Sequence, residues 1–141
     1  MKFRVYAKDV KDAQPIELEF PRGFRSDGQF LRPLNSAREP SAFAVLNTDN
    51  IAAVLPETFG EQSQQRQATE FDVFIKGRRE PLKVKAHLFD ASAGASVQFQ
   101  WIGFDSNKFP EIKRIDIPNV YVAISEVVAI YPVGGIPPNL E

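Results

Sequence analysis

Three short stretches of the first half of the chain recur, in the same order, in the second half. The matched pairs are Phe3-Arg4-Val5-Tyr6 with Phe71-Asp72-Val73-Phe74, Pro15-Ile16-Glu17-Leu18 with Pro81-Leu82-Lys83-Val84, and Ile51-Ala52-Ala53-Val54-Leu55-Pro56 with Val127-Val128-Ala129-Ile130-Tyr131-Pro132. Alternating polar and apolar residues indicate a half-buried strand, and a short apolar run that ends at proline indicates a buried one. The recurrence therefore predicts an internal repeat whose unit is about 60 residues of β-strands.

The repeat divides the chain into four segments. Residues 1–57 form a first small unit, 58–70 a linker or short helix, 71–133 a second small unit and 134–141 an irregular tail. We favour the helix for the linker because Gln, Glu and Arg are good helix formers. If the matches are instead a coincidence of two hairpin patterns, the same strands would build one larger barrel or sandwich.

Hairpins are the clearest local elements. The first covers 3–20, the second covers 71–86, and a further strand runs from 97 to 104. In the first hairpin we expect Ile16, Leu18 and Phe20 on one face of the returning strand. The segment between the first hairpin and residue 41 is rich in proline, glycine and arginine, so it predicts a long ordered loop.

The composition allows a hydrophobic core and excludes several kinds of chemistry. Of the 141 residues, 43% are hydrophobic, which is enough for a core without covalent cross-links. The chain has no cysteine and a single histidine, His87, so disulfides, thiolate metal sites and a zinc site built from histidines are excluded, and no cofactor is expected. The net charge of -1 argues against a protein that mainly coats a phosphate backbone.

The N-terminal sequence and the apolar runs bear on location. Charged residues recur every few positions near the N-terminus, without an apolar signal core. No apolar run approaches the length of a membrane span. We therefore expect a soluble, cytoplasmic protein that does not bind a membrane.

The C-terminal region carries a family resemblance. Two apolar runs, separated by Ser125-Glu126 and closed by Pro132, predict two short strands joined by a tight turn. The stretch from Val120 to Val128 resembles the second Sm motif of the bacterial Sm-like RNA chaperone Hfq, in which a strand with a Tyr-Lys-His triplet leads into Ala-Ile-Ser, a turn and a final Val-Val strand. The hairpin at 73–86 is similar to the first Sm motif of that family. The resemblance covers most of 71–133, with a fainter copy in 3–56.

The resemblance implies an all-β fold of two tandem small barrels, Sm-like or SH3-like, each of about five strands. It also implies that edge strands pair with their neighbours, either inside one chain or in rings. The lysine and histidine that contact RNA in that family have no counterpart between Tyr121 and Ala123, where only Val122 stands. The resemblance therefore does not carry RNA-chaperone activity to this chain.

Catalytic patterns are weak in this sequence. His87 stands between apolar neighbours on a strand pattern, where we expect it to point outward rather than to act as a base. Glu17 and Glu19 occupy alternate positions on one strand, which suits a solvated face, and no glycine-rich phosphate loop is present. We therefore expect no enzyme; phosphodiester cleavage by arginine and carboxylates is the weaker alternative.

Two basic clusters are the candidate binding residues. Their members are Arg22, Phe24, Arg25, Phe30, Arg32 and Arg38 in the predicted loop, and Lys76, Arg78 and Arg79 with Lys83 and Lys85 in the second hairpin. Guanidinium groups and aromatic rings together can grip phosphates and stack on bases. The plainer interpretation is that the two phenylalanines anchor the loop while its arginines are solvated or paired with Asp27 and Glu39, and that the lysines keep an edge strand soluble.

These features predict a non-enzymatic binding module. Its ligand would be a nucleotide or a short nucleic acid, held by the arginine-rich loop. The alternative is a structural, assembly or adaptor protein, for example virus- or mobile-element-encoded, that acts through strand edges. Its partners would be another protein or further copies of the chain.

Overall fold

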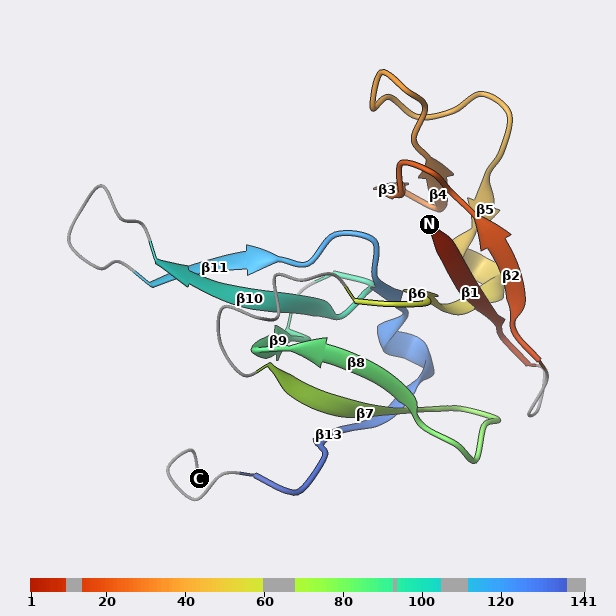
Figure 1. Cartoon of the computed structure of the whole chain (residues 1–141). Helices are drawn as coiled ribbons and strands as arrows, with labels where there is room; N and C mark the ends of the chain where they lie inside the picture. The colour runs from red at the N-terminus through yellow and green to blue at the C-terminus, as the bar shows by residue number, and fades with distance from the viewer. Residues whose placement is uncertain (10–13, 60–67, 93, 105–111, 137–141) are drawn as a thin grey trace.

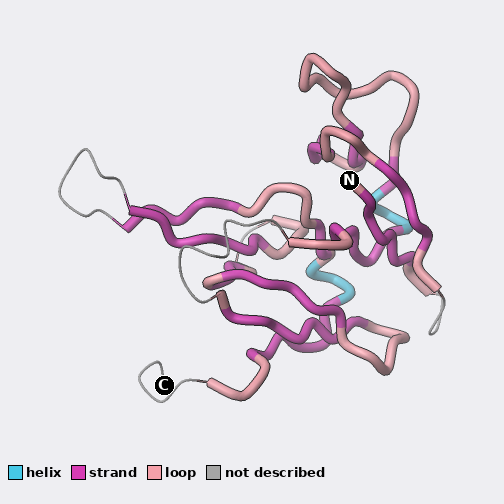
Figure 2. Tube along the Cα trace, viewed as in Figure 1, coloured by secondary structure: helices cyan, strands magenta, loops and turns pink. Residues whose placement is uncertain are grey.

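The computed structural model describes residues 1–9, 14–59, 68–92, 94–104 and 112–136, and within these ranges the protein is all-β (Figure 1). Figure 2 shows strands joined by loops and by two short 3₁₀ turns, η1 (Thr48–Asn50) and η3 (Ile124–Glu126). Most of the linker for which a helix was predicted lies outside the described residues, as does the end of the tail. In the described part of the chain, no helix is long and apolar enough to cross a membrane.

The first half forms two small antiparallel sheets. Its strands are β1 (Lys2–Ala7), β2 (Ile16–Glu19), β3 (Phe24–Asp27), β4 (Phe30–Pro33), β5 (Leu46–Asn47) and β6 (Ile51–Pro56). Strand β1 lies between β2 and β6 in one sheet, and β4 lies between β3 and β5 in the other.

The second half has a similar arrangement with one additional strand. Its strands are β7 (Thr69–Ile75), β8 (Leu82–Ala86), β9 (Leu88–Asp90), β10 (Gln98–Phe104), β11 (Ile112–Asp116), β12 (Tyr121–Val122) and β13 (Val127–Pro132). Strand β7 lies between β8 and β13, and β10 lies between β9 and β11. Strand β12 pairs with β6 of the first half, so the two halves share one sheet, β12-β6-β1-β2.

The two halves also agree in strand register. The matched stretches of the sequence pair residue for residue, so that Phe3 and Phe71 occupy the same position between their neighbouring strands. Both ladders contain a β-bulge at the same place, where Ala52 and Val128 are the extra residues. A 3₁₀ turn directly precedes β6 and another precedes β13. Each residue of β6 therefore has a defined equivalent in β13.

Strand β6 separates two hydrophobic cores. All six of its residues are buried. Ile51 and Val54 pack into the core of the first half, whereas Ala52, Ala53 and Leu55 pack into the core of the second half. A strand that is covered on both faces needs a continuous apolar run rather than an alternating one. This explains why the sequence from Ile51 to Leu55 contains no polar residue.

Strand β12 covers the outer edge of β6. Tyr121 and Ala123 pack into the core of the first half, although they belong to the second half of the sequence. The Ala123 amide donates a hydrogen bond of 2.9 Å to the Ala52 carbonyl. The predicted pairing of edges inside one chain is therefore present between β12 and β6.

Several local expectations are confirmed and others are wrong. Both predicted hairpins and the strand near residues 97–104 are present, and β7 and β8 bury alternate residues. Of the three residues expected on one face of the returning strand, Ile16 and Leu18 are exposed, whereas Phe20 is buried in the core of the first half. The predicted loop contains the hairpin β3–β4, whose two-residue connection begins with Gly28 at a φ of 57°. Glycine at the first position of a two-residue connection favours a hairpin. The prolines around it led to the prediction of a loop instead.

The predicted strand pair near the C-terminus has a different arrangement. Its two strands, β12 and β13, are joined by η3 and do not pair with each other. The first pairs with β6 and the second with β7. The described strands form several small sheets with open edges, and no closed barrel is detected among them.

Candidate functional site

The predicted arginine-rich loop uses its aromatic rings for packing. Phe24 lies against Phe3 and Phe20, with ring centroids 5.4 and 6.4 Å away, in the core of the first half. Phe30 is half-buried, and the guanidinium of Arg32 lies over its ring at 5.6 Å. The rings are therefore anchors of the hairpin, which leaves little aromatic surface on which a base could stack.

The arginines of this hairpin differ in their contacts. Arg32 Nε donates a hydrogen bond of 3.0 Å to Asp27 Oδ2, in an exposed ion pair across β3 and β4. Arg22, Arg25 and Arg38 are exposed, and none of them forms an ion pair with a described residue. These three guanidiniums are the part of the predicted site that remains available to an anion.

Two members of the second basic cluster make structural contacts. The Arg78 guanidinium lies 4.8 Å from the centroid of the Tyr6 ring, so it links the β7–β8 turn to the first half. Lys83 forms an ion pair with Asp72 on the neighbouring strand, and this hydrogen bond raises the pKa of the lysine. Lys76 and Arg79 are exposed in the turn.

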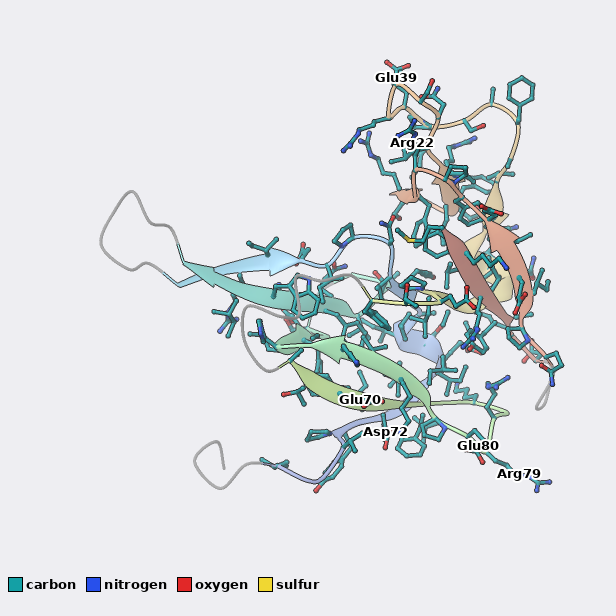
Figure 3. All side chains as sticks on the ribbon, viewed as in Figure 1. Arg22, Glu39, Glu70, Asp72, Arg79 and Glu80 are labelled. Carbon is teal, nitrogen blue, oxygen red and sulfur yellow. The ribbon has the colours of Figure 1, made fainter. Side chains whose placement is uncertain are left out.

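The two basic clusters do not lie together. Figure 3 shows Arg22 at the top of the molecule and Arg79 at the tip of the β7–β8 turn at the bottom. The first and second halves do pack against each other, but these two hairpins point in different directions. The clusters therefore do not flank a common groove.

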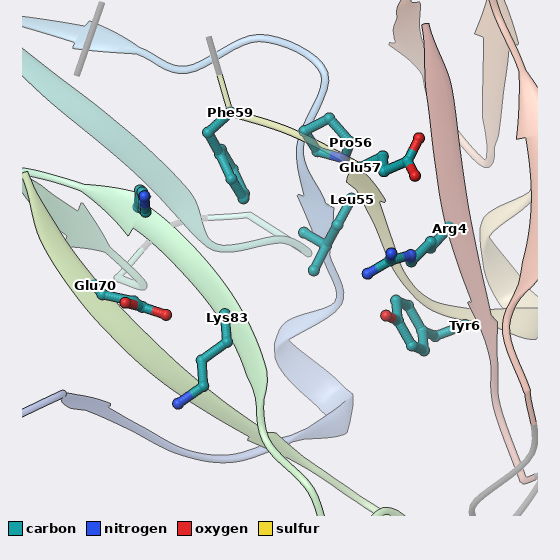
Figure 4. Close-up of a pocket in the computed structure, with 9 residues that line it drawn as sticks. Arg4, Tyr6, Leu55, Pro56, Glu57, Phe59, Glu70 and Lys83 are labelled. Atoms are coloured by element: carbon teal, nitrogen blue, oxygen red, sulfur yellow. The ribbon is translucent and has the colours of Figure 1, made fainter. Parts of the chain in front are cut away.

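A pocket of about 180 Å³ lies between the two halves (Figure 4). Figure 4 shows Arg4 and Tyr6 on one side, Glu70 and Lys83 on the other, and Leu55 between them. A second hollow of about 160 Å³, lined by residues of both halves that include Ser26 and Gln98, has a similar size. Pockets that enclose a nucleotide-sized ligand usually measure about 300–1,000 Å³. Both hollows are too small for that role.

His87 is also structural. Its Nδ1 accepts a hydrogen bond of 2.8 Å from the Ile102 amide, and its ring packs edge-on against buried Trp101 at 5.2 Å. It is half-buried, so the expectation that it points outward into solvent was wrong. Glu17 and Glu19 are exposed on β2, as the alternating pattern predicted.

Strand β13 has an open backbone edge. Within the described residues it pairs only with β7, whereas its equivalent, β6, pairs on both sides. The Val133 amide donates to the Glu70 carbonyl, so alternation along the strand directs the backbone of Tyr131 toward β7 and that of Ile130 and Val128 toward the open edge. Pro132 ends the row of available amides.

The side chains next to this edge are apolar and exposed. In β6, the residues at positions 52, 53 and 55 pack into the second core. Their equivalents in β13 are Val128, which is 66% exposed, Ala129, and Tyr131, which is 50% exposed. Val127 and Ile130 are the equivalents of Ile51 and Val54. They pack toward the core of the second half, as Ile51 and Val54 pack into the core of the first. We call Val128, Ala129, Ile130 and Tyr131, together with the backbone edge that they flank, the β13 edge.

The sequence carries one signal that bears on the β13 edge, the match between the apolar runs at 51–56 and 127–132. The match predicts two equivalent strands, but it does not predict which of them is covered. The predicted binding residues were instead chosen for charge, and none of them belongs to the β13 edge.

Comparison with protein-family models, with curated proteins and with solved structures finds no match to this chain. The resemblance to the Sm-like family therefore remains a prediction. The assignment of a function depends on the geometry of the two candidate sites, the exposed arginines and the β13 edge.

Proposed function

We propose that the chain is a non-enzymatic protein-interaction module that accepts an extended strand of a partner at the β13 edge. One observation carries the proposal: β6 and β13 agree in register and bulge, yet β12 covers β6 whereas no strand among the described residues covers β13. A strand edge with free backbone groups pairs readily with another extended chain, and the neighbouring side chains then select the partner.

The proposal includes a finer description of the fold. Each half is a small barrel-like unit, in which one three-stranded sheet packs on another and a 3₁₀ turn leads into the last strand. The identical register of the β1 and β7 ladders supports this description. In such a tandem, the last strand of one unit is covered by the short strand β12 of the next unit. In the part of the chain that the structure describes, no strand covers the second unit in this way.

The chemistry of the β13 edge suits a short apolar strand. Val128 and Tyr131 offer side-chain contacts, and Ile130 offers an amide and a carbonyl. Because Pro132 has no amide, the pairing would cover only a few residues, as the two-residue strand β12 does on β6. Exposed apolar side chains that are grouped in this way usually mark an interaction surface.

The test is a selection of random heptapeptides displayed on phage against the purified chain. We expect selected peptides with apolar residues at alternate positions, because an extended strand directs alternate side chains to one face. Their affinity should fall by at least about tenfold for the variant V128K/Y131K. The matched control is I16K/I115K, which places two lysines on exposed apolar positions elsewhere. Selected peptides that bind V128K/Y131K as well as wild type would contradict the proposal.

A second candidate function is nucleic-acid binding by Arg22, Arg25 and Arg38. It is favoured by the exposure of these three guanidiniums on one hairpin region. A fluorescein-labelled single-stranded oligonucleotide would bind with an affinity that falls as salt rises. The variant R22E/R25E should abolish the anisotropy change, whereas K76E/R79E, at the other end of the molecule, should leave most of it. Equal effects of the two variants would contradict a site on this hairpin.

A further inference from the structure

We infer that the occupant of the β13 edge is strand β5 of a second copy of this chain, so that copies join head to tail. The inference rests on the proposed function and names the partner. It follows from the internal contact between β6 and β12, which serves as a template. The equivalent of β6 in the second half is β13, and the equivalent of β12 in the first half is β5.

The equivalence of β5 and β12 is set by hydrogen bonds. The Thr48 amide donates to the Gln29 carbonyl, and the Ile124 amide donates to the Ala95 carbonyl in the same place of the second half. Each of these residues is the first of a 3₁₀ turn. Counting back from the turns, Asn47 corresponds to Ala123, Leu46 to Val122 and Val45 to Tyr121.

Strand β5 has an open edge that matches this role. Within the described residues it pairs only with β4, on the side to which the Thr48 amide points. Alternation along the strand directs the backbone of Asn47 and Val45 to the other side. The corresponding groups of β12, those of Ala123 and Tyr121, face β6 in the internal contact.

The side chains of β5 divide in the same way as those of β12. Leu46 packs into the core of its own half, as Val122 does. Tyr121 packs into the other half, whereas its equivalent, Val45, is 51% exposed. The described residues therefore include two uncovered apolar strand edges, one in each half of the chain. Together these edges correspond to the two sides of the β6–β12 contact that the chain already forms internally.

A nearby residue extends the apolar surface next to β5. Phe43 lies two residues before Val45 and is 99% exposed. Asn119 occupies the same distance before Tyr121, and its Oδ1 accepts a hydrogen bond of 3.1 Å from the Phe24 amide of the first half. The equivalent of Phe24 in the register of β9 and β10 is Phe89, which is half-buried. In the contact between two copies, Phe43 would thus approach Phe89.

The geometry determines the kind of assembly. The β5 edge and the β13 edge belong to different surfaces of one copy, so the contact is heterologous, and two joined copies together keep one free edge of each kind. Such contacts close into a ring or continue as an open chain, depending on the rotation between copies. The internal contact benefits from a high effective concentration, because one chain carries both partners. The contact between copies lacks this advantage, so we expect assembly to depend strongly on protein concentration.

The experiment is sedimentation of the full chain over a series of concentrations, with two blocked variants. V128K/Y131K blocks the β13 edge, and F43K/V45K blocks the β5 edge; all four side chains are exposed, so neither variant should impair folding. We expect the mass of wild type and of the control I16K/I115K to rise with concentration, and each blocked variant to remain a monomer. An equimolar mixture of the two blocked variants should form a complex of two chains and nothing larger, because only one intact contact remains.

Three results would overturn the inference. The first is a wild type that stays monomeric at every concentration, and the second is a blocked variant that assembles like wild type. The third is a mixture of the blocked variants that remains monomeric where wild type assembles. If wild type is monomeric while peptides still bind at the β13 edge, self-assembly is wrong and the interaction function stands. If the peptides fail as well, both are wrong.

Discussion

Gly23 lies where the first half contacts the loop that leads into β12. Its φ is 78°, and an added Cβ would lie 2.1 Å from Asn119 Oδ1. The same oxygen accepts the hydrogen bond from the Phe24 amide. Glycine is needed here for two separate reasons, the backbone conformation and the close approach of the second half.

Replacement of Gly23 by alanine should therefore destabilise the protein by more than the backbone strain alone would. We expect a loss of about 3 kcal/mol in the free energy of unfolding, of which about 1 kcal/mol is the cost of the left-handed conformation. Gly28→Ala is the matched control, because Gly28 has a φ of 57° and nothing within 4 Å of the added atom. Urea denaturation measures the free energy of unfolding of both variants. Equal losses in the two variants would contradict the contact with Asn119.

Tyr121 connects the two halves and titrates. Its side chain is buried in the core of the first half, and this burial raises the pKa of the phenol above its ordinary value of 10.0. The charge of Asp49 also raises this pKa, by a smaller amount, whereas a hydrogen bond with Thr48 lowers it. The folded protein therefore holds this proton more tightly than the unfolded chain does.

The raised pKa of Tyr121 predicts a loss of stability at alkaline pH. The stabilising contribution of Tyr121 is complete below pH 10, where its phenol is protonated in both the folded and the unfolded state. The contribution declines as pH rises through the pKa of the folded state. Urea denaturation of wild type and of Tyr121→Phe, measured at several values from pH 9 upward, isolates the effect by difference. The free energy of unfolding of wild type should approach or fall below that of the variant as pH rises. Parallel curves would contradict the assignment.

At the level of elements, the local patterns were predictable and the contacts between halves were not. The alternation of Phe71, Val73 and Ile75 with polar neighbours defines β7 without reference to any other part of the chain. The repeat likewise predicted that β6 and β13 are equivalent. It did not show that β12 would cover only β6, because that pairing depends on how the halves pack and leaves no local pattern.

The candidate site was harder to predict than the fold. Charge and aromatic content directed attention to Arg32 and Phe24, but Arg32 pairs with Asp27, and Phe24 packs against the core of the first half. Val128 and Tyr131 carry no such signal, since an apolar residue in a strand is normally buried. Only the comparison of β13 with β6 shows that no described strand covers these residues.

Equivalent alanines in β6 and β13 provide a direct test of this difference. Ala53 is 0% exposed between the two halves, whereas Ala129 is exposed at the same position of the second ladder. Ala53→Leu should overpack the shared core and lower the free energy of unfolding by about 1–3 kcal/mol. Ala129→Leu should change it by less than about 0.5 kcal/mol in dilute solution. Similar losses would show that β13 is covered within the monomer.

At the scale of the whole molecule, the shared strands predict that the two halves unfold together. Strand β6 contributes to both cores, and β12 crosses from the second half to the first. Neither half can lose its structure without exposing apolar surface of the other. A single cooperative transition is therefore expected, although the chain contains two repeated units.

The single tryptophan reports on this coupling. Trp101 is buried in the second half, and Gly23 lies in the first. Gly23→Ala should shift the urea midpoint of Trp101 fluorescence as far as it shifts the midpoint of the circular dichroism signal, because both report one transition. The midpoint of Trp101 fluorescence would stay unchanged if the halves unfold independently, and the circular dichroism curve would then show two steps.

The central claim is that β6 and β13 are equivalent strands of which only β6 is covered. Hydrogen exchange of the Val54 and Ile130 amides, followed by NMR at low and high protein concentration, tests it most directly. Val54 faces Tyr121 of β12, so its amide should be protected at both concentrations. The Ile130 amide should exchange rapidly in dilute solution and become protected as copies assemble. Strong protection of Ile130 in the dilute monomer, or rapid exchange of Val54, would contradict the account.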